Sequence, residues 1–121
     1  MKKRTILLIG KYKKVESDIS RYKRNFFVLA IDNLLGIKSL KKHDLEKIEA
    51  IAFKGHTNFN FPIMKKFPSL KIISNFGVGY DTINVEDAKK LNILITFTPD
   101  ILNDDVADMA IALYLLSLIH I

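Results

Sequence analysis

The stretch LKIISNFGVGYD, residues 70–81, decides how the rest of the chain is read. It begins with a short apolar run typical of a buried strand, and two glycines, Gly77 and Gly79, follow one residue apart. Glycines directly after a buried strand favour a loop whose backbone approaches a ligand closely. The first question is therefore whether this loop holds the phosphates of a nucleotide or something smaller.

A dinucleotide site needs the pattern Gly-x-Gly-x-x-Gly at the start of a helix. Here the third glycine position is occupied by Thr82, and the first apolar run ends in a single Gly10. The sequence also has no Gly-Lys-Ser/Thr triplet, which excludes a nucleoside-triphosphate loop. Successive amides at Val78 and Gly79 could still form a small concave anion site suited to one carboxylate. From these residues alone, a tight turn without a ligand is an equally good interpretation.

Short apolar runs alternate with segments of helical spacing along the chain. Strands are expected at residues 4–9, 25–30, 50–53, 71–74 and 93–96, and helices at 15–22, 43–48, 61–67 and 84–91. Apolar runs this continuous favour a parallel sheet covered on both faces. Right-handed crossovers then predict an α/β fold, a flavodoxin-like doubly wound parallel sheet of five strands that binds ligands at the carboxyl ends of its strands.

A long apolar helix is expected to follow the sheet. Asn103 is suited to cap it, and Asp104 and Asp105 place negative charge in its first turn, where the helix dipole favours it. Residues 106–119 are apolar apart from Asp108 and Ser117, but the run is shorter than the ~20 residues that cross a bilayer, so no membrane contact is expected. A helix that is apolar all round needs partners all round, so we expect a further domain to cover it.

Composition restricts the possible classes of protein. A chain of 121 residues, 49% of them hydrophobic, has room for one folded domain, and without cysteine it has no disulfide framework or thiolate metal site. The apolar stretch near the N-terminus is too short for a signal peptide, which favours a cytoplasmic location.

The net charge of +6 is unevenly distributed. Residues 1–70 hold 16 Lys and Arg against 6 Asp and Glu, a balance of +10, whereas residues 71–121 hold 3 against 7, a balance of −4. Such asymmetry can indicate a nucleic-acid-binding protein. However, no aromatic residues are interleaved with the lysines in a stacking pattern, so a solvated lysine-rich surface without nucleic acid is the preferred interpretation.

Two motifs together make the interpretation specific. NFGVGYD, residues 75–81, and TPDILNDDVAD, residues 98–108, stand in the order and spacing found in the D-isomer-specific 2-hydroxyacid dehydrogenases, which this sequence resembles, especially the glyoxylate/hydroxypyruvate reductase-like members. The stretch FKGHTNFNFPIMKKFPSLK, residues 53–71, resembles the preceding loop and helix of that family. The resemblance is clear from about residue 49 to 116 and weaker before it.

The resemblance implies an NAD- or NADP-dependent oxidoreductase that interconverts a 2-oxoacid and a D-2-hydroxyacid, and that is a homodimer when full length. In such enzymes the substrate domain is interrupted by a Rossmann domain. Residues 1–102 would then be the first part of a substrate-binding domain, and residues 103–115 an interdomain helix. The family's catalytic arginine, glutamate and histidine and its cofactor-binding glycines come later, so neither a catalytic residue nor a metal site is expected in this chain.

The resemblance also implies which residues bind small molecules. It places the backbone amides of Val78 and Gly79, with Gly77 beside them, on the substrate carboxylate. The residues that close the same cleft would be Lys54, Gly55 and His56, with His56 as a polar cleft residue and not the acid–base histidine. The residues against the nicotinamide end of the cofactor would be Leu102 and Val106.

One alternative function is a free-standing flavodoxin-like domain used for binding or signalling. A signalling receiver of this fold needs an aspartate at the end of its third strand, where this chain has Phe53 followed by Lys54. A basic nucleic-acid-binding domain is a third alternative, for which salt-dependent binding to DNA of any sequence is the test.

The terminal string LSLIHI, residues 116–121, has a separate interpretation. It is the translation of CTG TCT CTT ATA CAC ATC, a transposon end used in preparing sequencing libraries. We therefore expect these residues, His120 included, to be adapter read-through with no part in the fold or site. Genomic DNA that continues past codon 115 with the same string would contradict this interpretation.

Overall fold

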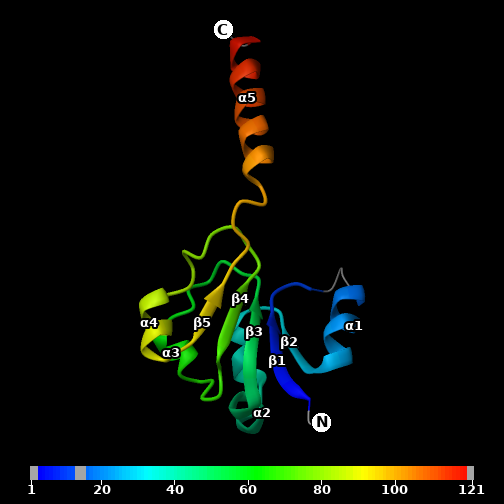
Figure 1. Ribbon diagram of the computed structural model, residues 1–121, viewed down its shortest axis with the longest axis vertical. Helices are drawn as coiled ribbons and strands as arrows, with labels where there is room; N and C mark the ends of the chain where they lie inside the picture. Colours follow the sequence, from blue (N-terminus) through cyan, green and yellow to red (C-terminus); the bar gives the residue numbers. More distant parts are fainter. Residues whose placement is uncertain (1–2, 13–15, 120–121) are drawn as a thin grey trace.

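Five parallel strands form the sheet that organises the molecule (Figure 1). The computed structural model describes residues 3–12 and 16–119. The strands lie in the order β2-β1-β3-β4-β5, which confirms the flavodoxin-like doubly wound arrangement. Their bounds are β1 Arg4–Ile9, β2 Phe26–Ile31, β3 Ile48–Phe53, β4 Ile72–Asn75 and β5 Leu94–Thr96.

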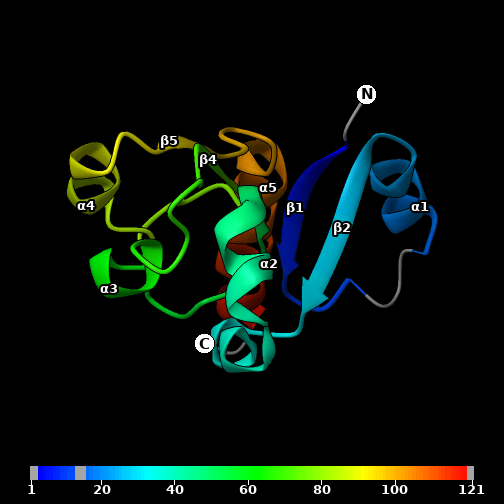
Figure 2. The ribbon, with the colours of Figure 1, turned by 90° about the horizontal axis from the view of Figure 1, so that it is seen from below.

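Helices connect the strands and lie on both sides of the sheet. They are α1 Glu16–Asn25, the 3-10 helix η1 Leu34–Ser39, α2 Lys42–Lys47, α3 Phe61–Met64, α4 Val85–Lys90 and α5 Asn103–Ile119. Figure 2 shows α2 and α3 on one side of the sheet and α1 on the other, beside β2. No helix within the described residues is long and apolar enough to cross a membrane.

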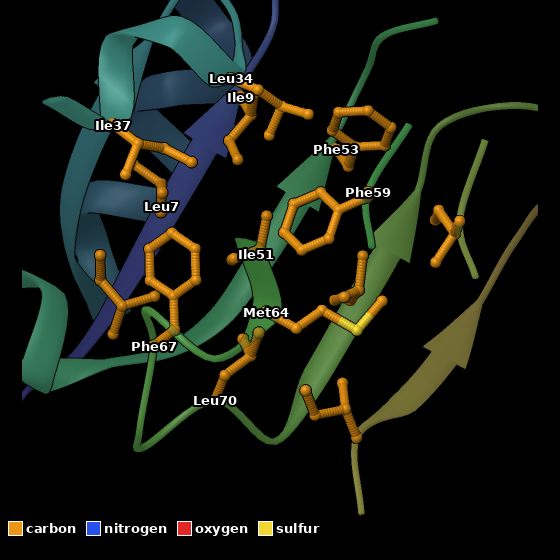
Figure 3. Close-up of a cluster of buried hydrophobic side chains, with 14 of the residues drawn as sticks. Leu7, Ile9, Leu34, Ile37, Ile51, Phe53, Phe59, Met64, Phe67 and Leu70 are labelled. Atoms are coloured by element: carbon orange, nitrogen blue, oxygen red, sulfur yellow. The ribbon is translucent and has the colours of Figure 1, made fainter. Parts of the chain in front are cut away.

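The main core lies between the sheet and the helices η1, α3 and α4, with Leu45 of α2 packed at its margin. Figure 3 shows Leu34 and Ile37 of η1 and Met64 of α3 among its side chains. Alternate residues of β1 and β3, among them Leu7 and Ile51, point into it, as does Ile73 of β4. The rings of Phe53 and Phe59 meet edge to face, with centroids 5.5 Å apart. Because burying each such side chain contributes about 1.5–3 kcal/mol, this core holds the ends of β3 and β4 firmly in place.

The opposite face of the sheet is covered only in part. Ile6 and Leu8 of β1 are buried on the side where α1 packs. Toward the far edge, in contrast, Ser74 of β4 is exposed and Leu94 of β5 is 60% exposed. The prediction of helices over both faces is thus right around β1 and wrong for β4 and β5 in the described part of the chain.

Several element boundaries differ from the predicted ones. Ile48, expected at the end of a helix, begins β3 and is fully buried, because the sheet needs an apolar residue at this position. The helix predicted at 61–67 ends at Met64 and continues as turns. The helix η1 was not predicted; the side chain of Asn33 accepts hydrogen bonds from two of its backbone amides and so caps it. Val15, the expected start of the first helix, lies outside the described residues.

The helix α5 extends away from the sheet, past the carboxyl ends of the strands (Figure 1). All of its described side chains are exposed, although most are apolar. The predicted N-cap position of Asn103 is wrong: the Leu102 carbonyl accepts the first helical hydrogen bond, from Val106, so Asn103 lies inside the first turn. Its side-chain amide donates to the Asp100 carboxylate at 2.9 Å. The helix continues through residues 116–119, whereas residues 120–121 of the expected adapter string lie outside the described residues.

We expect the chain to self-associate through α5. Burying a Leu or Ile side chain contributes about 1.5–3 kcal/mol, so several exposed ones on one helix favour association. Sedimentation velocity should show species heavier than a monomer, and Ile111→Gln with Leu115→Gln should shift the chain toward monomer. Leu35→Gln, at an even more exposed apolar residue outside α5, should not. A clean monomer of the unmodified chain at micromolar concentration would contradict this prediction.

Candidate functional site

Two loops lie side by side where β3 and β4 end. We call residues 54–58 the lysine loop and residues 76–81 the glycine loop. The strands pair in parallel with Phe53 opposite Asn75, and the amide of Phe76 donates to the Phe53 carbonyl at 2.8 Å. The carboxyl edge of a parallel sheet is where ligands bind in this fold class. The structure therefore brings together the two segments that the sequence singled out.

Hydrogen bonds to two carbonyls hold the glycine loop. Asn75 is only 5% exposed, and its side-chain amide donates to the Gly79 carbonyl at 2.5 Å. The backbone amide of Thr98 donates to the Gly77 carbonyl at 3.0 Å. The first contact closes the loop on itself, and the second ties it to the segment that leads into α5.

This arrangement leaves backbone donors free. Because the peptide unit is planar and trans, the N–H of Val78 points opposite to the Gly77 carbonyl and therefore away from Thr98. Within residues 3–12 and 16–119, no group accepts a hydrogen bond from the N–H of Val78 or Gly79. Both residues are exposed, so a ligand can reach these amides.

The fold itself does not require glycine in this loop. Neither Gly77 nor Gly79 has a positive φ. A Cβ on Gly77 would approach no atom closer than 3.5 Å, and one on Gly79 none closer than 3.6 Å, which are ordinary contacts. What the two glycines provide is open space beside the free amides.

The lysine loop, in contrast, is packed closely against the end of β1. The amide of Lys54 donates to the Ile9 carbonyl at 2.7 Å. Gly10 has a φ of +135°, and a Cβ on it would lie 2.4 Å from the Lys54 carbonyl oxygen. A Cβ on Gly55 would lie 3.1 Å from the ring of Phe53. Glycine at positions 10 and 55 therefore allows the backbone of Lys54 to lie close to the end of β1 and to the ring of Phe53.

The two loops also contact each other directly. The ammonium of Lys54 lies 4.9 Å from the centroid of the exposed Phe76 ring. Beyond the lysine loop, Phe59 accepts a hydrogen bond from Asn84 and donates one to Thr82, at 3.1 and 2.6 Å. His56 is exposed on the lysine loop, and within residues 3–12 and 16–119 its side chain makes no hydrogen bond or ion pair. Lys54 also occupies the place where a signalling receiver would need its aspartate.

The segment before α5 joins the site through Phe97 as well as Thr98. The rings of Tyr80 and Phe97 meet edge to face, 4.9 Å apart. At the start of α5, the amide of Val106 donates to the Leu102 carbonyl at 2.9 Å. The side chains of Leu102 and Val106 are both exposed. Leu102 and Val106 therefore form an accessible apolar pair at the start of α5.

Five residues that help to build the site had no assigned role in the sequence interpretation: Asn75, Phe76, Tyr80, Phe97 and Thr98. Asn75, Phe76 and Tyr80 lie inside the motif NFGVGYD and Thr98 begins the second motif, so the motifs themselves were the available signal. The pairing of Phe97 and Thr98 with the glycine loop depends on the adjacency of β4 and β5, which no local pattern reveals.

Charge around the glycine loop is mixed. Asp81 lies beside Gly79, since a Cβ on Gly79 would be 3.6 Å from its carboxylate oxygen. Lys54 is the positively charged side chain in contact with the loop's first residue. Within residues 3–12 and 16–119 there is no group of three or more His, Asp or Glu side chains that could hold a metal ion.

Two hollows lie elsewhere on the surface of the described residues. One of about 510 Å³ lies beside the ends of β1 and β2, and its lining includes Asp32 and Asn33. Another of about 570 Å³ lies at the opposite edge of the sheet, and Glu49 and Lys71 on its wall are paired at 2.9 Å. Its charged lining residues are Lys3, Arg4, Lys47 and Lys71 together with Glu46 and Glu49. The first presents a carboxylate and the second lies at the amino ends of the strands, so the glycine loop remains the candidate.

A small cavity of about 110 Å³ lies behind the glycine loop, lined by Tyr12, Tyr22, Ser74 and Thr98 among others. The Tyr12 hydroxyl donates to the Ala52 carbonyl at 3.3 Å. Burial, with a smaller contribution from Tyr22, raises the pKa of Tyr12 from 10.0 to about 12.

The raised pKa of Tyr12 predicts a pH dependence. The folded state keeps the phenol protonated, so its contribution to stability is complete below pH 10 and is lost as pH rises toward 12. In an ultraviolet titration of tyrosine ionisation, Tyr12→Phe should remove a late-titrating component of the four-tyrosine chain. Loss of an early component instead would contradict the assignment.

Comparison with known proteins agrees with this arrangement. Residues 12–112 match the profile of the family described as D-isomer specific 2-hydroxyacid dehydrogenase, catalytic domain. The chain is 37% identical over 82 residues to the glyoxylate reductase of Pyrococcus horikoshii, covering 68% of this chain and 24% of that one. It is 44% identical over 66 residues to the 2-ketogluconate reductase of Gluconobacter oxydans, covering 54% and 21%.

The fold is shared with a solved structure of the same kind. The NADPH-dependent glyoxylate/hydroxypyruvate reductase of Sinorhizobium meliloti, in complex with NADP and malonate, superposes with a TM-score of 0.75 at 36% identity, covering 94% of this chain and 34% of that one. The chain thus spans about a fifth to a third of the length of these proteins. It belongs to the D-isomer specific 2-hydroxyacid dehydrogenase family, and its match lies in the family's catalytic domain.

Proposed function

We propose that this chain is the substrate-binding part of an NAD- or NADP-dependent oxidoreductase that interconverts a 2-oxoacid and a D-2-hydroxyacid of the glyoxylate or hydroxypyruvate type. The observation that carries the proposal is the unbonded amide of Val78, which points away from Thr98, on a loop whose glycine carbonyls are held by Asn75 and Thr98. Two adjacent free amides suit one carboxylate, the group that all 2-oxoacids share. The named activities of the similar reductases support the same substrate class.

Each part of the site has a role in this proposal. The amides of Val78 and Gly79 bind the carboxylate and so orient the neighbouring carbonyl carbon, while the lysine loop forms the adjacent wall. A bound nicotinamide cofactor supplies the hydride. Leu102 and Val106 suit its nicotinamide end, because both are apolar and exposed at the start of α5.

The cofactor's phosphates need a different binding surface. The described residues carry no glycine-rich turn at a helix N-terminus of the kind that holds a pyrophosphate. We therefore propose that the main cofactor site belongs to a Rossmann domain, that residues 1–102 are the substrate domain's first part, and that residues 103–115 form the connecting helix. Homodimer formation and a cytoplasmic location remain predictions from the sequence.

Because the substrate site and the main cofactor site are proposed to lie in different domains, the 121-residue chain is expected not to turn over substrate by itself. Mixed with NADH or NADPH and glyoxylate, it should leave the absorbance at 340 nm unchanged, because it lacks the pyrophosphate site and the family's later catalytic residues. Titration should likewise leave NADH fluorescence unchanged. A purified reductase from the same family, tested in parallel, is the positive control. Measurable reduction of glyoxylate by this chain would contradict the proposed division between domains.

A further inference from the structure

We propose that Lys54 makes this site prefer 2-oxoacids that carry a second carboxylate. The inference rests on the proposed function, because it assumes that the amides of Val78 and Gly79 hold the first carboxylate. It concerns a separate feature of the site, the positive charge that the lysine loop presents next to the glycine loop.

The backbone of Lys54 is fixed in this position. It directly follows β3, and its amide donates to the Ile9 carbonyl at 2.7 Å. Gly10 packs so closely against Lys54 that a Cβ added at Gly10 would clash with the Lys54 carbonyl, so the backbone of Lys54 cannot shift toward β1. The start of the side chain is therefore set by the two central strands β1 and β3.

The ring of Phe76 directs the ammonium group toward the glycine loop. The 4.9 Å separation between the ammonium and the ring centroid lies within the range of a cation–π contact. Phe76 precedes Val78 by two residues, a span of at most about 7 Å along the backbone. The ammonium of Lys54 therefore lies against the residue that begins the glycine loop, two positions before the first free amide.

The charges around the glycine loop allow Lys54 to distinguish ligands with two carboxylates from ligands with one. The amides carry no net charge, and Asp81 beside Gly79 opposes any anion. A ligand with one carboxylate binds only the amides of Val78 and Gly79. A ligand with two carboxylates can also place its second carboxylate against the Lys54 ammonium. That side chain is exposed, so the gain is the modest one of a surface ion pair, about threefold to fivefold in affinity.

Two ligands with the same carbon skeleton isolate this effect, namely 2-oxoglutarate and 2-oxopentanoate. Each is titrated into the ¹⁵N-labelled chain carrying Ile111→Gln and Leu115→Gln, and the dissociation constant is taken from the amide shifts of the glycine loop. We expect 2-oxoglutarate to bind about threefold to fivefold more tightly than 2-oxopentanoate, with the preference shrinking as NaCl is raised.

Substitutions at Lys54 test whether this residue causes the preference for 2-oxoglutarate. Lys54→Met should remove it, and Lys54→Arg should retain it, because arginine keeps both the charge and the contact with the ring. Lys65→Met is the matched control, since Lys65 also lies over a ring, that of Phe61 at 6.0 Å, but on α3 and its following turn. Circular dichroism should show the same fold for all three variants.

The outcomes separate this inference from the proposed function. If both ligands shift the glycine-loop amides but Lys54→Met keeps the preference, the role of Lys54 is wrong and the carboxylate site stands. An equal affinity of the unmodified site for both ligands also overturns the role of Lys54. If neither ligand shifts these amides, the carboxylate site itself is wrong.

Discussion

Gly10→Ala is expected to lower the free energy of unfolding by about 2–6 kcal/mol. The substitution forces a residue with a Cβ to adopt a φ of +135°, a strain of about 1–3 kcal/mol. It also places that Cβ 2.4 Å from the Lys54 carbonyl oxygen, and overpacking of this kind costs about 1–3 kcal/mol more. Urea unfolding followed by circular dichroism measures the change.

Gly77→Ala is the matched control for this prediction. The residue has no positive φ, and its added Cβ would meet nothing closer than 3.5 Å, so stability should change by less than about 1 kcal/mol. Equal stability of the Gly10→Ala variant and the unmodified chain would show that β1 and the lysine loop are not packed as described.

Gly79→Pro is expected to weaken carboxylate binding at least about tenfold. Proline has no backbone N–H, so the substitution removes one of the two donors proposed for the carboxylate. The loss of a hydrogen bond to a charged group costs about 1.5–3 kcal/mol. Titration with glyoxylate, followed at the remaining amide of Val78, measures the effect.

Gly79→Ala separates the loss of the donor from a change in shape. Alanine retains the N–H, and its Cβ would lie at an ordinary 3.6 Å from the Asp81 carboxylate. Its affinity should therefore lie much closer to that of the unmodified chain. If Gly79→Pro bound glyoxylate as tightly as Gly79→Ala, the amide of Gly79 would have no role in binding.

Much of the fold could be predicted from the sequence because the central strands are buried on both faces. Residues 6–9 of β1 are apolar without interruption, and the matching strand was predicted with the bounds that the structure shows. Errors arose where tertiary packing decides between local alternatives. Ile48 fits a helix end as well as a strand start. The side chain of Asn103 makes its hydrogen bond with the Asp100 carboxylate and not with the helix amides.

The site was predictable in position but not in detail. The two glycines after a buried strand predicted a ligand-facing loop at the sheet's carboxyl edge, where the structure places it. The hydrogen bond from Thr98 to Gly77 joins residues far apart in the sequence, and it forms only because β5 pairs with β4. The contact of Lys54 with Phe76 likewise depends on the pairing of β3 with β4.

The most direct test of the carboxylate site is an amide-resolved titration with glyoxylate, compared with the neutral analogue glycolaldehyde. The ¹⁵N-labelled chain should show saturable shifts of the Val78 and Gly79 amide signals with glyoxylate alone. The amide of Gly36, which is already bonded to Asn33, should not move. Unchanged Val78 and Gly79 signals, or shifts centred on the hollow beside Asp32, would contradict the assignment of the glycine loop as the substrate site.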